Sequence, residues 1–423
     1  MQIHVVHPGE TLWLIAQRYG VTVTQIVTAN QLESPSKLVS GLALVVPTPT
    51  QTHTVQPGEN LTQIAQRYGT TVEEISKINQ IQNPNMILSE TILTIPANKP
   101  VIDVNAYTIN TGETGAREIQ EVGQYLTYWM PFVYTIREDG GLSTIDDTAM
   151  LQSAAAERVV PVMAITNFSA TAAGSSLAHS VLASTDIQDV LLTNILKVMK
   201  EKGYQGLNID FENVLPVDRE NYNQFLQRAV DRLHPEGYSV STALAPKISD
   251  EQKGLLYEAH DYAEHGRIVD FVVLMTYEWG YRLGPPQAIS PLNEIKRVLD
   301  YAVTVIPRNK ILFGFQIYAR DWLLPHVQGQ EAETFSQQEA IRRAIQYGVA
   351  IQYDPIAQSP FYRYTDAEGR NHEVWFEDAR SAQAKFDVVK DYNLRGISYW
   401  VLGYPFPQNW LLLEDNFTIR KIR

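Results

Sequence analysis

The sequence predicts an α/β fold: a closed (β/α)8 barrel that carries a small α+β insertion and is preceded by two copies of a short β-α-α-β module. Three observations predict it. The N-terminal part repeats itself at a constant offset of 49 positions, the remainder alternates strand-like apolar runs with helical runs, and the interval at about residues 322–377 is too long for one helix. Strands that alternate with helices over ~250 residues are typical of a parallel barrel.

The two repeats are predicted to occupy residues 2–48 and 51–97. Two segments carry the repeat: Pro-Gly-Glu at 8–10 and 57–59, and Ile-Ala-Gln-Arg-Tyr-Gly at 15–20 and 64–69. In each copy a short strand runs into the Pro-Gly-Glu turn, and two short helices and a closing strand follow. Thr11 and Asn60 are the predicted N-caps of the first helix, and Gly20 and Gly69 are predicted to end it.

This pattern resembles LysM modules, which bind polymers containing N-acetylglucosamine, such as peptidoglycan and chitin. The resemblance implies a glycan groove between the turn after the first strand and the loop after the second helix. The glycan-binding residues expected on this basis are Gly9, Thr11, Asn30, Gly58, Asn60 and Asn79. The alternative is that the glycines and asparagines only form turns. Two weak sites on one chain would also gain by avidity on a repetitive polymer.

Residues 98–423 are expected to form the barrel, after a linker around Pro100. Seven strands are predicted, at 125–130, 159–165, 206–211, 239–243, 271–276, 311–317 and 396–400. An eighth is expected either just before Asn167 or near 102–107. Helices are predicted at 185–202, 219–233, 291–305 and 380–391. The interval 322–377 has strand-like pieces of its own and is interpreted as an inserted subdomain that forms one wall of a cleft above the barrel.

One predicted strand alternates polar and apolar side chains in a way that points to chemistry. Asn208, Asp210 and Glu212 alternate with Leu207, Ile209 and Phe211. Because side chains on a strand alternate faces, the apolar set would pack beneath helices and the polar set would face the barrel interior, at the end of the strand where barrel active sites lie. Burying three polar groups is costly unless they bond to one another or act on a ligand. A catalytic cluster is therefore predicted here, and a purely structural polar network is the alternative.

The same segment resembles the fourth-strand motif D-G-x-D-x-D-x-E of family 18 glycoside hydrolases, with Gln205 and Asn208 in place of the first two aspartates. Met-Thr-Tyr-Glu at 275–278 resembles the M-x-Y-D of the family's sixth strand, with Glu278 for the aspartate. Trp400, at the end of the last predicted strand, matches the tryptophan beneath the reactive sugar. The resemblance covers nearly all of residues 98–423.

The family resemblance implies a retaining hydrolysis in which the substrate's own 2-acetamido carbonyl attacks the anomeric carbon. By that resemblance Glu212 is the general acid and later the base, Asp210 holds the acetamido N–H, and Tyr277 donates to the acetamido oxygen. The expected substrate contacts are Asn208, Met275, Trp400, Gln316, Tyr318 and Trp279. Trp279 could equally be a core or rim aromatic. We further expect Asn208 to donate a hydrogen bond to Asp210 and so keep it ionised.

Composition excludes several other classes of function. With 34 Lys and Arg against 47 Asp and Glu the formal charge is −13, which is unfavourable for nucleic acid or an anionic membrane. There is no cysteine, and the nine histidines show no ligand spacing, so no metal and no cofactor is expected. His4, His7, His260 and His265 are interpreted as surface or packing residues. No membrane-spanning stretch and no secretory signal peptide is recognised.

Two such modules before such a barrel resemble the glycosidases that digest the cortex peptidoglycan of bacterial endospores during germination. The resemblance implies an N-acetylglucosaminidase acting on peptidoglycan, located in the spore cortex or coat region or at the cell wall. One alternative is a chitinase or endo-N-acetylglucosaminidase acting on other glycans. Another is a glycan-binding protein with an inactive barrel, against which the intact Glu212, Asp210 and Tyr277 argue.

Overall fold

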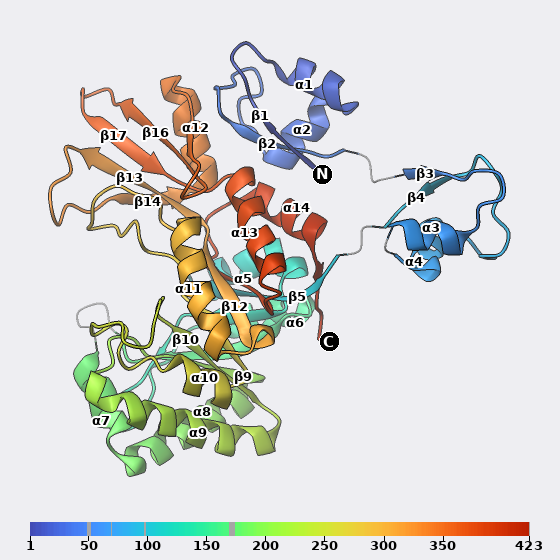
Figure 1. Cartoon of the computed structure of the whole chain (residues 1–423). Helices are drawn as coiled ribbons and strands as arrows, with labels where there is room; N and C mark the ends of the chain where they lie inside the picture. Colours follow the sequence, from blue (N-terminus) through green and yellow to red (C-terminus); the bar gives the residue numbers. More distant parts are fainter. Residues whose placement is uncertain (49–51, 69, 97–98, 169–173, 423) are drawn as a thin grey trace.

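The computed structural model describes residues 1–48, 52–68, 70–96, 99–168 and 174–422. Two small modules precede a barrel with an additional antiparallel sheet, which confirms the predicted fold class (Figure 1). The predicted helix end at Gly69 and the predicted module boundaries at 51, 97 and 98 lie outside the described residues.

Both modules have the predicted order of elements. The first contains β1 (Gln2–Val5), α1 (Leu12–Tyr19), α2 (Val23–Asn30) and β2 (Ala43–Val46). The second contains β3 (Thr52–Thr54), α3 (Leu61–Tyr68), α4 (Val72–Ile78) and β4 (Ile92–Thr94). In each, the two strands pair antiparallel. Thr11 caps α1 by accepting the backbone N–H of Leu14, and Asn60 accepts that of Gln63 at the start of α3, so both N-cap predictions are confirmed.

Eight parallel strands close the barrel, because the last strand pairs with the first. They are β5 (Val101–Thr108), β6 (Tyr128–Pro131), β8 (Val160–Thr166), β9 (Gly206–Asp210), β10 (Ser239–Leu244), β11 (Phe271–Leu274), β12 (Ile311–Gln316) and β18 (Gly396–Trp400). The eighth strand is therefore β5, at the second of the two predicted positions. The short strands β7 (Tyr134–Thr135) and β19 (Thr418–Ile419) pair with β8 and β5.

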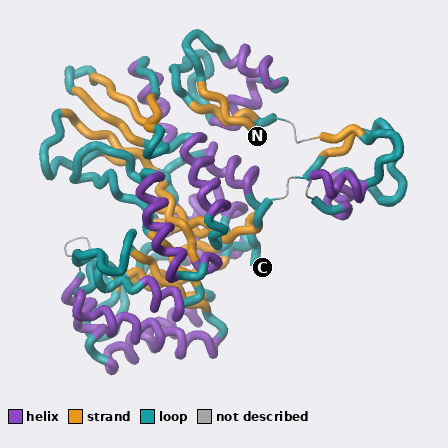
Figure 2. The backbone as a smooth tube through the Cα atoms, in the orientation of Figure 1, coloured by secondary structure: helices purple, strands orange, loops and turns teal. Residues whose placement is uncertain are grey.

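Helices surround the barrel strands on the outside (Figure 2). They are α5 (Gly112–Val122), α6 (Thr148–Ala156), α7 (Ser175–Leu182), α8 (Thr185–Lys202), α9 (Arg219–Leu233), α10 (Tyr262–Ile268), α11 (Leu292–Val305), α13 (Ala379–Asp391) and α14 (Pro407–Asn416). Short 3-10 turns lie at Gly123–Tyr125, Pro216–Asp218, His234–Glu236 and Arg308–Lys310. Leu207, Ile209 and Phe211 are buried in the core between strands and helices, as the alternation of β9 predicts. Among the described helices, none is both long and apolar enough to cross a lipid bilayer.

The insertion is an antiparallel sheet with one helix. Its elements are β13 (Tyr318–Leu324), β14 (Glu333–Ser336), α12 (Gln337–Tyr347), β15 (Gln352–Asp354), β16 (Ser359–Thr365) and β17 (Asn371–Trp375), with strand order β14-β13-β17-β16-β15. The sheet begins at Tyr318, slightly before the predicted 322. Its core is continuous with that of the first module: Ala344 and Tyr362 belong to the same buried cluster as Ile15 and Leu44.

Candidate active site

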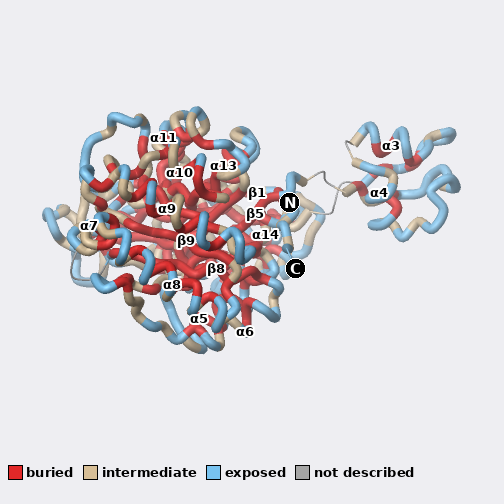
Figure 3. The backbone as a smooth tube through the Cα atoms, turned by 90° about the horizontal axis from the view of Figure 1, so that it is seen from below, coloured by how far each residue is buried: buried red, intermediate tan, exposed pale blue. Residues whose placement is uncertain are grey.

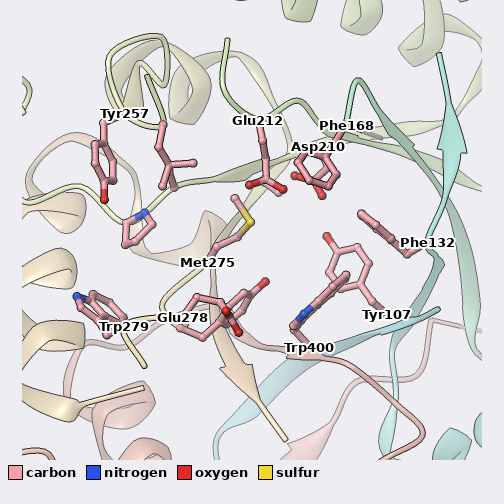
Figure 4. A pocket seen from close by; sticks show the side chains of 15 residues that line it. Tyr107, Phe132, Phe168, Asp210, Glu212, Tyr257, Met275, Glu278, Trp279 and Trp400 are labelled. Carbon is pink, nitrogen blue, oxygen red and sulfur yellow. The ribbon is translucent and has the colours of Figure 1, made fainter. Parts of the chain in front are cut away.

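A cavity of about 330 Å³ opens at the carboxyl ends of the barrel strands. Six of the predicted site residues line it: Asp210, Glu212, Met275, Tyr277, Trp279 and Trp400. Figure 4 shows the carboxylates of Asp210 and Glu212 on the same side of the site, facing Trp400 and Tyr107 across the cavity. The geometry thus brings together the acid pair that the strand pattern predicts and the aromatic side chains Tyr277 and Trp400 that the family resemblance implies.

Two residues of the neighbouring strand hold the backbone of the acid pair. Asn167 accepts the backbone N–H of Glu212 at 2.9 Å and donates its amide to the Glu212 carbonyl at 2.8 Å. Thr166 donates its hydroxyl to the carbonyl of Asp210 at 2.8 Å. Both follow from the parallel pairing of β8 with β9, in which Thr166 lies opposite Asp210. Neither was predicted as a site residue, because the pairing partner of β9 cannot be read from the motif alone.

Burial shifts both acids toward their protonated forms. The pKa of Asp210 lies well above its usual value, because the carboxyl is almost fully buried and faces the charge of Glu212. Burial also raises the pKa of Glu212, with a further contribution from the charge of Glu278. Two neighbouring buried carboxylates cannot both ionise easily, so the pair keeps one proton to a higher pH than two separate, exposed carboxyl groups would. A protonated Glu212 is what a general acid requires.

Asn208 does not play the role predicted for it. Its amide donates to the Ser241 hydroxyl at 3.0 Å, and its carbonyl oxygen accepts the Tyr107 hydroxyl at 3.0 Å. The predicted hydrogen bond to Asp210 is therefore wrong, and the pKa of Asp210 is raised rather than lowered. The physical reason is that the adjacent strand β10 supplies Ser241 and the more distant strand β5 supplies Tyr107, and these two side chains satisfy the amide of Asn208.

Aromatic side chains form the apolar side of the cavity. Trp400 packs edge-on against Phe132 and Tyr107, at ring-centroid distances of 4.9 and 5.5 Å. It lies nearly parallel to the ring of Tyr277, with centroids 6.5 Å apart. Burial raises the pKa of Tyr277 well above its usual value, so its hydroxyl stays protonated and available as a donor. Such a surface suits the apolar face of a pyranose ring.

Two predicted substrate contacts are corrected by the structure. Gln316 is fully buried and donates its amide to Glu377 at 2.9 Å. Tyr318 donates its hydroxyl to Glu278, so this hydroxyl already has a hydrogen-bond partner within the protein. Neither lines the cavity. Both were expected there from their position at the end of the seventh strand, but Gln316 bonds to Glu377, in the segment between β17 and α13, and Tyr318 bonds to Glu278, in the loop after β11.

The insertion does not form a wall of this cavity. None of the residues that line it falls within 322–377, so that expectation is wrong. The inserted sheet instead supports the cavity through one side chain. Arg320 on β13 donates to the carboxylate of Glu278 with both terminal guanidinium nitrogens, at 2.8 and 3.0 Å. It thereby holds in place a carboxylate that does line the cavity.

Replacing Glu278 by Gln is expected to move the alkaline limb of the pH–rate profile to lower pH. The charge of Glu278 contributes to the raised pKa of Glu212, and activity is lost as pH rises through that pKa because the general acid deprotonates. Removing the charge lowers the pKa of Glu212, so activity is lost earlier. The measurement is kcat/KM against pH, with Glu264→Gln, an exposed carboxylate paired with Arg267, as the control. An alkaline limb that stays in place or moves to higher pH would contradict the assignment.

The glycan contacts predicted for the two modules fall into two groups, one exposed and one bonded within the module. Gly9, Thr11, Gly58 and Asn60 are exposed at the turn before the first helix of each module, where a ligand can reach them. Asn30, in contrast, is wholly buried, and its amide group bonds to the backbone of Ile26 and Val45.

Asn79 uses its side chain in the same way as Asn30. Its amide donates to the carbonyls of Ile75 and Thr94, and its oxygen accepts the N–H of Thr94. The glycan contacts predicted for Asn30 and Asn79 are therefore wrong. Each asparagine joins the second helix to the closing strand, which agrees with the structural alternative more closely than with sugar binding.

The histidines singled out in the sequence are mostly internal. His4 bonds to Tyr19 at 3.1 Å and to Glu10 at 2.8 Å, and the second module repeats this arrangement around His53. His260 and His265 are buried behind the carboxyl ends of the strands, whereas His7 is exposed. Within the part of the chain that the structure describes, no group of three or more acidic or histidine side chains is arranged to hold a metal ion.

Comparison with known proteins identifies both parts of the chain. The family described as glycosyl hydrolases family 18 matches residues 163–404, and the LysM domain matches residues 4–47 and 53–96. The cortical fragment-lytic enzyme of Bacillus subtilis is 52% identical over 427 residues, which cover 100% of this chain and 99% of the relative. The enzyme of the same name from Bacillus cereus is 46% identical, with the same coverage. The crystal structure of the spore cortex-lytic enzyme SleL of Bacillus megaterium superposes with a TM-score of 0.87 at 40% identity, over 99% of each chain.

Proposed function

The chain belongs to glycosyl hydrolase family 18 and carries two LysM domains, and from this premise we propose that it is a spore cortex-lytic N-acetylglucosaminidase. Its substrate is the glycan of cortex peptidoglycan or of fragments released from it, cleaved after N-acetylglucosamine. The observation that carries the proposal is the convergence of Asp210, Glu212, Tyr277 and Trp400 on one cavity, in a chain similar over its full length to cortical fragment-lytic enzymes. Action on the cortex places the protein at the spore.

The proposed first step breaks the glycosidic bond without a protein nucleophile. Glu212, protonated because its pKa is raised, gives its proton to the leaving glycosidic oxygen. The carbonyl oxygen of the sugar's 2-acetamido group attacks the anomeric carbon as the bond to the leaving oxygen breaks, which forms a cyclic oxazolinium. Tyr277 donates to that acetamido oxygen and orients it.

Asp210 and Glu212 complete the reaction. Asp210 accepts the acetamido N–H and, when ionised, balances the positive charge of the oxazolinium. In the second step Glu212, now a carboxylate, takes a proton from water while the water oxygen attacks the anomeric carbon from the face that the leaving group vacated. The acetamide is restored, the configuration is retained, and both acids return to their starting protonation. A sugar that lacks the 2-acetamido group has no nucleophile and is inert.

Product analysis tests the proposal most directly. Purified cortex fragments, chitin oligosaccharides and cello-oligosaccharides are incubated separately with the protein, and the products are identified by mass. Cortex fragments are expected to give products with N-acetylglucosamine at the new reducing end, and cello-oligosaccharides are expected to remain intact. Faster turnover of chitin oligosaccharides than of cortex fragments would favour a chitinase instead. Cleavage of cello-oligosaccharides would exclude the substrate-assisted mechanism.

A further inference from the structure

The two LysM modules, although similar in sequence, lie in different surroundings. The first is packed against the catalytic domain and bonded to it at several places, and the ammonium group of Met1, just before this module, also pairs with Asp415 at 2.7 Å. The backbone N–H of Ile351 donates to the carbonyl of Ser40 at 2.8 Å. The side chain of Arg380 donates to the carbonyl of Gly41 at 3.0 Å, and the side-chain amide of Gln338 donates to the carbonyl of Asn30 at 2.8 Å. In the second module, every hydrogen bond found among the described residues 52–68 and 70–96 stays within the module, and Figure 3 shows it apart from the rest of the chain.

One position explains why only the first module fits against the catalytic domain. Gly41 has a φ of +84°, and a Cβ atom at this site would lie 1.8 Å from the carbonyl oxygen of Ile351. The equivalent residue of the second module, 49 positions later, is Glu90, at a similar φ of 71°. A glutamate side chain cannot be accommodated where even a methyl group collides with backbone. The second module therefore cannot pack against the surface around Ile351 that the first module covers.

Apolar residues that are covered in the first module are uncovered in the second. Val39 and Ala43 are 8% and 1% exposed, because the inserted helix and the barrel pack over them. Their equivalents Leu88 and Ile92 are 78% and 67% exposed. Met86, at the position of Lys37, is 75% exposed as well. The second module thus presents an apolar strip to solvent, with Met86 and Leu88 in the loop after its second helix and Ile92 at the start of β4.

This loop is one wall of the groove in which a LysM module would hold a sugar chain. In the first module the hollow between Gly9–Thr11 and residues 36–40 is bordered on another side by Ile345, Gly348 and Ala350, which follow α12 or lie at its end. The catalytic domain therefore occupies space along this groove. In the second module the corresponding segments, 58–60 and 85–89, carry the exposed Met86 and Leu88, which suit the apolar faces of sugar rings.

We propose that the two modules have different roles: the second holds the glycan, and the first is a fixed part of the catalytic unit, whose groove is bordered on one side by the inserted subdomain and is thereby less accessible to a long sugar chain. The inference rests on the proposed function, since it takes the ligand to be the same N-acetylglucosamine-containing glycan. The consequence is that attachment and catalysis are assigned to separate parts of the chain, with the first module acting as the rigid base between them.

A matched pair of substitutions tests how much the groove of each module contributes to glycan binding. Met86→Glu and Lys37→Glu place the same acidic side chain at equivalent exposed positions of the second and first modules. Both are made in the full-length chain carrying Glu212→Gln, so that the ligand is not digested during the measurement. Binding is followed by co-sedimentation with insoluble cortex peptidoglycan, and thermal unfolding confirms that each variant is folded. Leu88→Glu is a second, independent change in the groove of the second module.

Met86→Glu and Leu88→Glu are each expected to weaken binding about tenfold, because a charge is placed against an apolar contact. Lys37→Glu is expected to change binding less than twofold. Equal weakening by Lys37→Glu and Met86→Glu, or no weakening by either second-module variant, would overturn the division of roles. These outcomes are distinct from a failure of the proposed function, which would appear as the wild-type chain releasing no products from cortex fragments.

Discussion

The Glu212→Gln variant is expected to lose about 100- to 10,000-fold in kcat on cortex fragments. Glutamine has almost the size of the acid but has no proton to give to the leaving oxygen and cannot later deprotonate water. The loss should fall on kcat rather than on KM, because the apolar side of the cavity around Trp400 is unchanged. The measurement is the initial rate of reducing-end release at saturating substrate.

The matched control for this variant is Glu118→Gln. Glu118 is also a largely buried glutamate whose pKa is raised by burial, but it lies on α5 and does not line the catalytic cavity. Its variant is expected to keep the wild-type kcat. If wild type and Glu212→Gln released reducing ends at the same rate, the barrel would be a binding domain and the proposed mechanism would be abandoned.

The second large effect is expected on stability, from Lys385→Met. Lys385 on α13 and Glu377, in the segment just before this helix, are 0% and 1% exposed and form an ion pair of 2.7 Å, and Glu377 also accepts a hydrogen bond from the amide of Gln316. Removing the ammonium leaves a buried carboxylate without its counter-charge, which costs about 3–5 kcal/mol of unfolding free energy. Urea unfolding followed by tryptophan fluorescence measures the change.

A double variant distinguishes loss of a partner from loss of packing. Adding Glu377→Gln to Lys385→Met removes the unpaired charge while the amide can still bond to Gln316. Part of the lost stability is expected to return, so the double variant should be more stable than Lys385→Met alone. A double variant less stable than either single variant would mean that packing, and not the buried charge, dominates at this site.

Local patterns along the chain were sufficient for most of the fold. The tandem repeat, the N-caps Thr11 and Asn60, and seven of the barrel strands are encoded by residues close together in the sequence, so they could be predicted. The two-residue alternation of β9 likewise placed Asp210 inward and Phe211 outward. The position of the remaining strand was left open between two segments, and the structure assigns it to β5, which pairs with β6 and with β18, nearly three hundred residues away.

The partners of polar side chains were the least predictable part of the site. Asn208, Gln316 and Asn30 were all expected to face substrate or Asp210, and each instead bonds to another group of the protein that lies on a different element. A polar residue at a strand end has the same local pattern whether its neighbour is a sugar or a glutamate from an insertion. Only the packing of the neighbouring elements distinguishes the two.

What the sequence determined by itself was therefore the order of elements and the identity of the acid pair, since periodicity and spacing are local properties of the chain. What only the tertiary structure decided was how those residues behave. The burial that raises the pKa of Asp210 depends on atoms from segments remote in the sequence. The packing of the first module, but not the second, against the catalytic domain depends on such atoms as well. Two repeats with the same order of elements differ in exposure because a glycine in the first permits a contact that a glutamate in the second forbids.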